Sequence, residues 1–162
     1  MSEKTLRHVV VPRTLCFVFC GDDVLLIRAS QEKDWQGMFD PIGGHIEKGE
    51  DVVESANREI KEEAGLTVTD TKLRGVIHVS NFFGKEIMLF ITQSFTTNKE
   101  VHPSHEGIPQ WVKVTILEKV KVFADVKPII EMLGKLKPDQ LFTGISVFDG
   151  KEGLVSIKLS IK

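Results

Sequence analysis

The segment over residues 44–66 constrains the fold more than any other part of the chain. Apolar residues recur at i, i+3 and i+7 from Val53, which is the spacing of one face of a helix. Asp51 before this run and Gly65 after it are favoured cap residues at the two ends of a helix. The pattern therefore predicts a helix over 51–64, and any fold proposed for this chain has to accommodate it.

Glu59, Glu62 and Glu63 lie in the last two turns of this predicted helix and converge on one side, because they are three or four residues apart. Each close pair of like charges costs about 0.2–0.5 kcal/mol, and the negative end of the helix dipole adds to that cost. Arg58 can pair with a neighbouring glutamate but cannot neutralise them all. An all-oxygen cluster without a nearby cysteine or paired histidine favours Mg²⁺, with Mn²⁺ as a substitute. A solvated, salt-bridged helix is the alternative that the charge pattern alone leaves open.

The spacing of this segment resembles the Nudix box, G-x5-E-x7-R-E-U-x-E-E-x-G-U, in which U is a bulky aliphatic residue. All nine specified positions are matched: Gly44, Glu50, Arg58, Glu59, Ile60, Glu62, Glu63, Gly65 and Leu66. The preceding FDPIGG and the elements around the box also suit this family, over residues 8–136. The resemblance implies an α/β (α+β) fold of the Nudix type, an α/β/α sandwich in which helices flank a mixed sheet. We expect one such domain over residues 1–162.

The resemblance also implies a reaction: Nudix hydrolases cleave a nucleoside diphosphate linked to another group, with Mg²⁺. The family pattern assigns metal binding to the backbone near Gly43 and to Glu59, Glu62 and Glu63. Glu50 and Arg58 are expected to orient the loop and the helix. Glu106 lies where relatives supply a distal glutamate, so we expect a metal ligand or general base there, or else a loop charge facing solvent. Which glutamate is the base stays open, and His102 and His105 are expected to be solvated.

The order of the later elements resembles the MutT-type branch, which hydrolyses oxidised purine nucleoside triphosphates such as 8-oxo-dGTP. The resemblance implies that Phe123 stacks on the base and Asp125 reads its edge, with Asp40 approaching from the other side. A carboxylate can accept the N1 and N2 hydrogens of guanine, and a protonated acid can donate to O6. Simpler structural roles stay open: a core position for Phe123, an N-cap for Asp125 and a turn contact for Asp40.

Other candidates for the substrate site come from the first two strands and the loop after them. Arg28 and Lys33 are candidates to meet a substrate phosphate, and Thr14 is a candidate to line the base pocket. Trp35 is expected to cap the loop, with stacking on a base as the alternative. The family pattern commonly has Trp near Phe39, so this chain departs from the sanitising enzymes there.

The rest of the chain predicts strands and one more helix. We expect a hairpin over 14–20 and 24–28, strands over 73–80, 86–96 and 109–114, a helix over 126–136 and a closing hairpin over 141–161, with polar loops over 29–38 and 98–107. Because strands and helices are interleaved irregularly, these elements favour a mixed sheet flanked by helices.

Composition limits the partners and the compartment. The formal net charge of −2 argues against a general nucleic-acid binder, so we expect no stable nucleic-acid partner. The chain lacks an apolar leader and any window of 18 apolar residues, which favours a cytoplasmic protein with no membrane partner. Cys16 and Cys20 would lie roughly 13 Å apart on one strand, too far for a disulfide. We expect a monomer or a homodimer with reduced thiols.

Together these patterns predict a Mg²⁺-dependent pyrophosphohydrolase that converts a nucleoside triphosphate, with an oxidised purine base, to the monophosphate and pyrophosphate. Another Nudix substrate is the first alternative: ADP-ribose, a dinucleoside polyphosphate or the 5′ end of RNA. A nucleotide-sensing module without turnover is the second. The complete set of box carboxylates disfavours it, since non-catalytic modules generally lose them.

Overall fold

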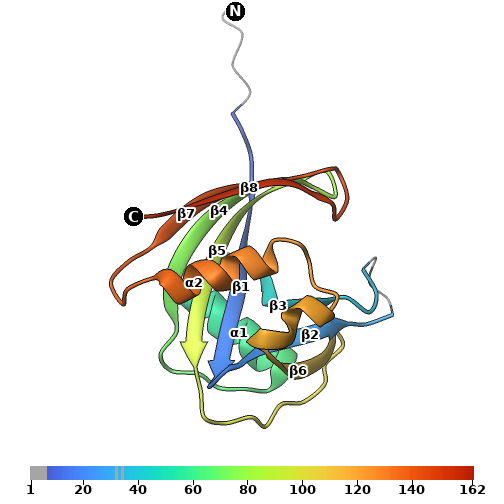
Figure 1. The fold of residues 1–162 in the computed structure, drawn as a ribbon, viewed down its shortest axis with the longest axis vertical. Coiled ribbons are helices and arrows are strands. Elements are labelled where there is room, and N and C mark those ends of the chain that lie inside the picture. Colours follow the sequence, from blue (N-terminus) through green and yellow to red (C-terminus); the bar gives the residue numbers. More distant parts are fainter. Residues whose placement is uncertain (1–6, 32, 34) are drawn as a thin grey trace, which may run out of the picture.

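The structure is a computed structural model that describes residues 7–31, 33 and 35–162. Within these residues, eight strands form one mixed sheet in the order β6-β2-β3-β1-β5-β4-β7-β8 (Figure 1). The strands are β1 (Val11–Cys20), β2 (Asp23–Ala29), β3 (Phe39–His45), β4 (Lys72–Phe82), β5 (Lys85–Phe95), β6 (Gly107–Lys113), β7 (Phe142–Phe148) and β8 (Leu154–Ile161). The helices are α1 (Val52–Ala64), the 3₁₀ helix η1 (Val114–Lys119) and α2 (Val126–Lys135).

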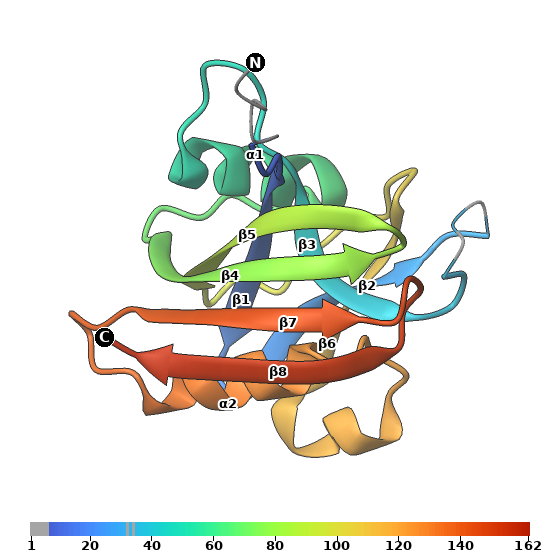
Figure 2. The ribbon, with the colours of Figure 1, turned by 90° about the horizontal axis from the view of Figure 1, so that it is seen from above.

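The sheet separates two apolar layers, one under each α-helix. On one face, α1 buries Ala56 and Ile60 against residues of β1, β2 and β3. On the other face, α2 buries Ile129 and Leu133 against side chains of β1, β4 and β5. Figure 2 shows α1 and α2 on opposite sides of the strands. The predicted α/β/α sandwich with a mixed sheet is therefore confirmed.

The predicted helix over 51–64 is confirmed, together with both of its caps. The Asp51 carboxylate accepts hydrogen bonds from the backbone N–H groups of Val53 and Glu54 at 2.7 and 2.9 Å. The Glu54 carboxylate accepts in turn from the Asp51 N–H at 2.9 Å, which completes a capping box. At the other end, Gly65 has φ +72° and its N–H donates to the Lys61 carbonyl at 3.0 Å. These bonds fix where α1 begins and ends, and so fix the positions of its glutamates.

The predicted hairpin over 14–20 and 24–28 is only partly right. β1 and β2 pair with each other at only two positions beside their turn. Beyond these positions β3 lies between them and pairs antiparallel with both. Sequence reasoning predicted no strand here, because Pro41 lacks an N–H for the ladder and Gly43 and Gly44 have low strand propensity. The inserted strand is what brings this segment to the centre of the molecule.

The remaining predicted elements are confirmed with small shifts at their ends. β4, β5 and β6 correspond to the three later strands, and α2 corresponds to the second helix. β7 and β8 form the closing hairpin, and β7 continues the sheet by pairing parallel to β4 (Figure 2). The six-residue 3₁₀ helix η1 was not predicted. Cys16 and Cys20 are free thiols, as expected. Among the described helices, none combines the length and apolar character needed to cross a membrane.

Candidate active site

Arg58 lies within α1 and bonds both to Glu50, just before the helix, and to glutamates of the helix itself. Its Nε and one Nη donate to the two oxygens of Glu50 at 2.5 and 3.0 Å. Its other Nη donates to Glu59 at 2.8 Å and to Glu62 at 3.2 Å. The guanidinium also donates to the carbonyl of His45, the last residue of β3, at 3.1 Å. Hydrogen bonding to Arg58 lowers the pKa of Glu50 to about 2, so this pair stays ionised. Arg58 thereby ties α1 to β3 and to the loop between them.

Glu63 is a buried carboxyl group with no positive partner. Its exposed fraction is 7%, and among the described side chains no cation lies close enough to lower its pKa. Burial, followed by the negative charge of Glu59, raises the pKa of Glu63 to about 9. At neutral pH this group therefore keeps a proton unless a cation neutralises it.

Two glycines of β3 let the chain approach this cluster closely. A Cβ on Gly44 would lie 2.2 Å from Oε1 of Glu59, and a Cβ on Gly43 would lie 2.3 Å from the carbonyl oxygen of Thr14. Neither position has room for a side chain unless its neighbours move. The Glu59 carboxylate thus packs directly against the backbone of β3.

The donor atoms gathered here fit a divalent cation. Glu59, Glu62 and Glu63 and the nearby β3 carbonyls offer oxygen ligands, which hard cations such as Mg²⁺ prefer. A buried carboxylate without a partner is costly, and a cation at this position would remove that cost. The residues predicted to bind metal therefore supply suitable ligand atoms, although among the described residues no three of these carboxylates place an oxygen within 4.8 Å of one another.

Glu106 comes to this cluster from the loop before β6. It forms ion pairs with Lys33 and with His105, whose Nε2 lies 3.1 Å from a Glu106 oxygen. Burial opposes ionisation of Glu106, but Lys33 and His105 together lower the pKa of Glu106. The charge of Glu106 contributes to the raised pKa of Glu63, so the two carboxyls lie near each other. His105 and His102 are largely exposed, as expected.

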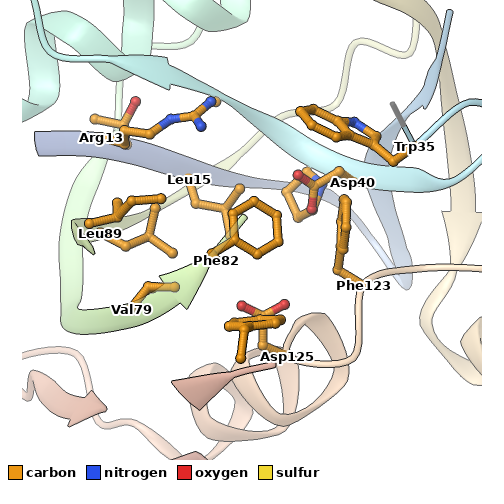
Figure 3. A pocket seen from close by; sticks show the side chains of 14 residues that line it. Arg13, Leu15, Trp35, Asp40, Val79, Phe82, Leu89, Phe123 and Asp125 are labelled. Carbon is orange, nitrogen blue, oxygen red and sulfur yellow. The ribbon is translucent and has the colours of Figure 1, made fainter. Parts of the chain in front are cut away.

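A cavity opens on the α2 face of the sheet beside this cluster (Figure 3). The space inside it, counted together with open solvent at its mouth, is about 620 Å³. Aromatic rings form much of its wall: the centroids of Phe82 and Phe148 are 5.0 Å apart, and those of Phe82 and Phe123 are 5.5 Å apart. Trp35 completes this wall, with its ring centroid 5.9 Å from that of Phe123. The cavity offers flat apolar surfaces to a ring-shaped ligand.

Asp40 and Asp125 line the cavity and differ in their affinity for a proton (Figure 3). Burial raises the pKa of Asp125 to about 6. Burial and then the charge of Asp125 raise the pKa of Asp40 well above its usual value, although Arg13 acts in the opposite direction. Near pH 7 most Asp125 is therefore ionised and can accept, whereas burial favours the protonated form of Asp40, which can donate. Asp40 also contributes to the raised pKa of Glu63, so the cavity and the glutamates are neighbours.

Asp125 occupies the N-cap position of α2 but makes no capping hydrogen bond with its side chain. The interpretation of Asp125 as an N-cap is therefore wrong for its carboxylate, which faces the cavity instead (Figure 3). Phe123 is 4% exposed and belongs to the core while also lining the cavity. Trp35 likewise packs against the core and lines the cavity.

The first two strands contribute to the cavity unevenly. Thr14 is buried and lines it, although its hydroxyl has no hydrogen-bond partner. Arg28 is exposed on β2 and is not among the lining residues. Arg13 lines the cavity and was not predicted. The alternation of side chains along β1 places Arg13 on the same face as Leu15 and Phe17, so this signal was available.

Comparison with known proteins shows the class to which this fold and cluster belong. The family model of the NUDIX domain matches residues 10–133. The chain belongs to the Nudix family and is a hydrolase of that family. Members of the family act on small nucleotide substrates and generally use divalent metal ions.

Individual relatives cover most of the chain. It is 28% identical over 152 residues to an uncharacterized Nudix hydrolase, YvcI, of Bacillus subtilis strain 168, covering 90% of this chain and 92% of that protein. It is 30% identical over 126 residues to an oxidized purine nucleoside triphosphate hydrolase of Danio rerio, covering 76% and 78% of the two chains. The crystal structure of a MutT protein from Bacillus halodurans matches with a TM-score of 0.80 at 29% identity, covering 93% of this chain and 98% of that chain.

Proposed function

We propose that this protein is a Mg²⁺-dependent pyrophosphohydrolase that converts a nucleoside triphosphate to the monophosphate and pyrophosphate. Its preferred base is an oxidised purine, as in 8-oxo-dGTP. The observation that carries the proposal is the adjacency of the glutamate cluster and the aromatic cavity: Asp40 and Gly43 of β3 line the cavity, and the next residue, Gly44, packs against Glu59. The similarity to the Danio rerio oxidized purine nucleoside triphosphate hydrolase supports the choice of base.

The proposed reaction breaks one bridging P–O bond of the triphosphate and forms one bond between phosphorus and the oxygen of water. Glu59, Glu62, Glu63 and the backbone near Gly43 would hold Mg²⁺, which would supply positive charge to the phosphate oxygens. Arg58 and Glu50 hold the Glu59 carboxylate in place by the hydrogen bonds described above. The proton of the attacking water passes to a carboxylate of the cluster, for which Glu63 and Glu106 are the two candidates.

Base recognition in the proposal uses the different protonation of the two cavity acids. The ionised Asp125 accepts the N1 and N2 hydrogens of a guanine edge, and the protonated Asp40 donates to O6. Adenine offers the opposite pattern at N1 and at its exocyclic position, so it would leave a buried acid unpaired. Stacking on an aromatic ring such as Phe123 adds about 1–3 kcal/mol per base.

A pyrophosphate-release assay over a nucleotide panel, with and without Mg²⁺, tests the proposal. The panel contains 8-oxo-dGTP, dGTP, ATP, ADP-ribose, a dinucleoside tetraphosphate and RNA with a 5′ triphosphate, and product chromatography follows those that release no pyrophosphate. We expect 8-oxo-dGTP to have the highest kcat/KM and turnover to require the metal. A preference for another member of the panel would overturn the proposed substrate, and equal turnover in EDTA would overturn the metal role.

Variants test the glutamate cluster and the base-binding cavity separately. Glu59→Gln should lower kcat at least about 10²-fold, as expected when metal and electrostatic stabilisation are lost. The matched control is Glu131→Gln, an exposed position on α2, which should behave like the wild type. Asp125→Ala should instead erode the preference among bases. An unchanged ranking of dGTP, 8-oxo-dGTP and ATP in Asp125→Ala would remove the base-reading role.

A further inference from the structure

Two histidines and a glutamate meet away from the glutamate cluster of α1. Nε2 of His78 on β4 lies 3.0 Å from Oε2 of Glu86 on β5 and 3.2 Å from Nε2 of His8. The third side of this triangle, from His8 Nε2 to Glu86 Oε2, is 3.7 Å. His8 precedes β1, so three separate segments of the chain supply one atom each. We call these three side chains the His8–His78–Glu86 cluster.

This cluster lies on the opposite face of the sheet from the substrate cavity. Ile77 and Val79 on β4 belong to the apolar layer under α2, and Val79 lines the cavity. Side chains alternate along a strand, so His78 between them points to the other face. On β5, Ile87 likewise faces the cavity layer while its neighbour Glu86 faces away from it. The cluster is therefore independent of the residues proposed to bind the base.

The three atoms are spaced as the ligands of one metal ion are. The three separations define a point about 1.9 Å from each atom, close to the 2.0–2.2 Å bonds that imidazole and carboxylate form with zinc. An ion at bonding distance would lie just outside the plane of the three atoms. His8 is 58% exposed, and His78 and Glu86 are about 30% exposed, so solvent can supply the remaining ligands. Two imidazoles and one carboxylate favour a transition metal ion over Mg²⁺.

Glu86 is held in the orientation that such a site needs. Its Oε1 accepts hydrogen bonds from the hydroxyl of Ser80 at 2.9 Å and from the backbone N–H of Asn81 at 3.0 Å. These bonds leave Oε2 as the atom that faces the histidines. Such outer contacts of a ligating carboxylate typically orient it and tune metal affinity.

Without a metal ion, hydrogen bonds among these three side chains meet their donor and acceptor requirements poorly. A neutral imidazole has one N–H and one lone pair, and Nε2 of His78 lies within hydrogen-bonding distance of two groups at once. If it donates to Glu86, it has no lone pair left to accept from His8. If both histidines carry a proton on Nε2, the two donors face each other. A cation that accepts one lone pair from each ring and one from Glu86 resolves this conflict.

We infer that the His8–His78–Glu86 cluster is a second metal site, which takes a borderline transition metal ion of the Zn²⁺ type. It is distinct from the proposed Mg²⁺ site and does not depend on the proposed hydrolysis. Because His8 lies on the segment before β1, a bound ion fastens that segment to the β4–β5 hairpin. We expect a bound ion to hold residues 7–10 against this hairpin and to raise the free energy of unfolding.

Co²⁺ and Zn²⁺ titrations of tag-free protein in excess Mg²⁺ test this inference. Visible absorption of Co²⁺ reports nitrogen ligation, and Zn²⁺ added afterwards should displace it. We expect one Co²⁺ per chain in the wild type and at least a tenfold weaker affinity in His8→Ala and in His78→Ala. Ser80→Ala should weaken binding about 10–100-fold through the loss of an outer contact. The matched control His102→Ala, an exposed histidine outside the cluster, should bind Co²⁺ as the wild type does.

Several outcomes would overturn the second site. These are no Co²⁺ bound in excess Mg²⁺, equal affinity in the wild type and in His8→Ala, or loss of binding in His102→Ala. His8 lies outside every strand and helix, so His8→Ala leaves the fold intact even if His78→Ala does not. Mg²⁺-dependent turnover should be unchanged in His8→Ala, which separates a failure of this site from a failure of the proposed function.

Discussion

Replacing Glu63 with glutamine should stabilise the metal-free protein at alkaline pH, even though it removes a proposed metal ligand. The pKa of Glu63 is about 9 in the folded protein, compared with an ordinary value of 4.5. The folded state therefore holds a proton that the unfolded state releases between these two values. The contribution of Glu63 to the free energy of unfolding is greatest below pH 4.5 and is lost as pH rises towards 9, at up to about 1.4 kcal/mol per pH unit. Glutamine does not titrate, so Glu63→Gln escapes this loss.

Urea unfolding in EDTA at pH 5 and pH 8 measures the effect. The free energy of unfolding of Glu63→Gln, relative to the wild type, should rise by as much as about 4 kcal/mol between these two pH values. Any constant cost of burying the amide cancels in this comparison. Glu62→Gln is the matched control, because Glu62 is 57% exposed and already paired with Arg58. A difference between Glu63→Gln and the wild type that does not grow with pH would refute the isolated, buried carboxyl described above.

Three further predictions address Gly44 of β3, the N-cap of α1 and the cavity. Gly44→Ala should lower kcat at least tenfold with the base preference intact, because its Cβ would meet Oε1 of Glu59 at 2.2 Å; wild-type kcat would contradict the close packing. Asp51→Ala should lower the free energy of unfolding by about 0.5–2 kcal/mol in urea titrations, and an unchanged urea midpoint would show that the N-cap does not stabilise α1. Below pH 6 the KM for 8-oxo-dGTP should rise, roughly tenfold by pH 5, since protonation removes the acceptor on Asp125; the same rise in Asp125→Asn would assign it to another group.

Local sequence signals predicted α1 and its surroundings well. The cap at Asp51, the stop at Gly65 and the spacing of the glutamates all lie within one short segment, and each acts through bonds to near neighbours. The same holds for the closing hairpin, which pairs β7 with β8 across a short turn. Where the stabilising partner is close in the chain, the pattern of residue types carries enough information.

Contacts between distant segments were harder to predict. β3 is stable because β1 and β2 supply its hydrogen bonds from both sides, and within FDPIGGH only Phe39 and Ile42 favour a strand. The pairing of Lys33 with Glu106 joins two loops that sequence reasoning treated separately. Asp125 was at the correct end of α2, but only the cavity shows that its carboxylate faces a ligand space rather than the helix. These roles depend on tertiary packing, which local secondary-structure propensity does not predict.

The insertion of β3 between β1 and β2 has a consequence for how such a protein can diversify. A single extended strand supplies an acid to the substrate cavity at Asp40 and, four residues later, the glycine that seats Glu59. Inserting or deleting one residue between them would shift one relative to the other and turn one of the two to the wrong side of the sheet. Changes of substrate can therefore arise more freely at Trp35 or Phe123, which lie off this strand, than within it.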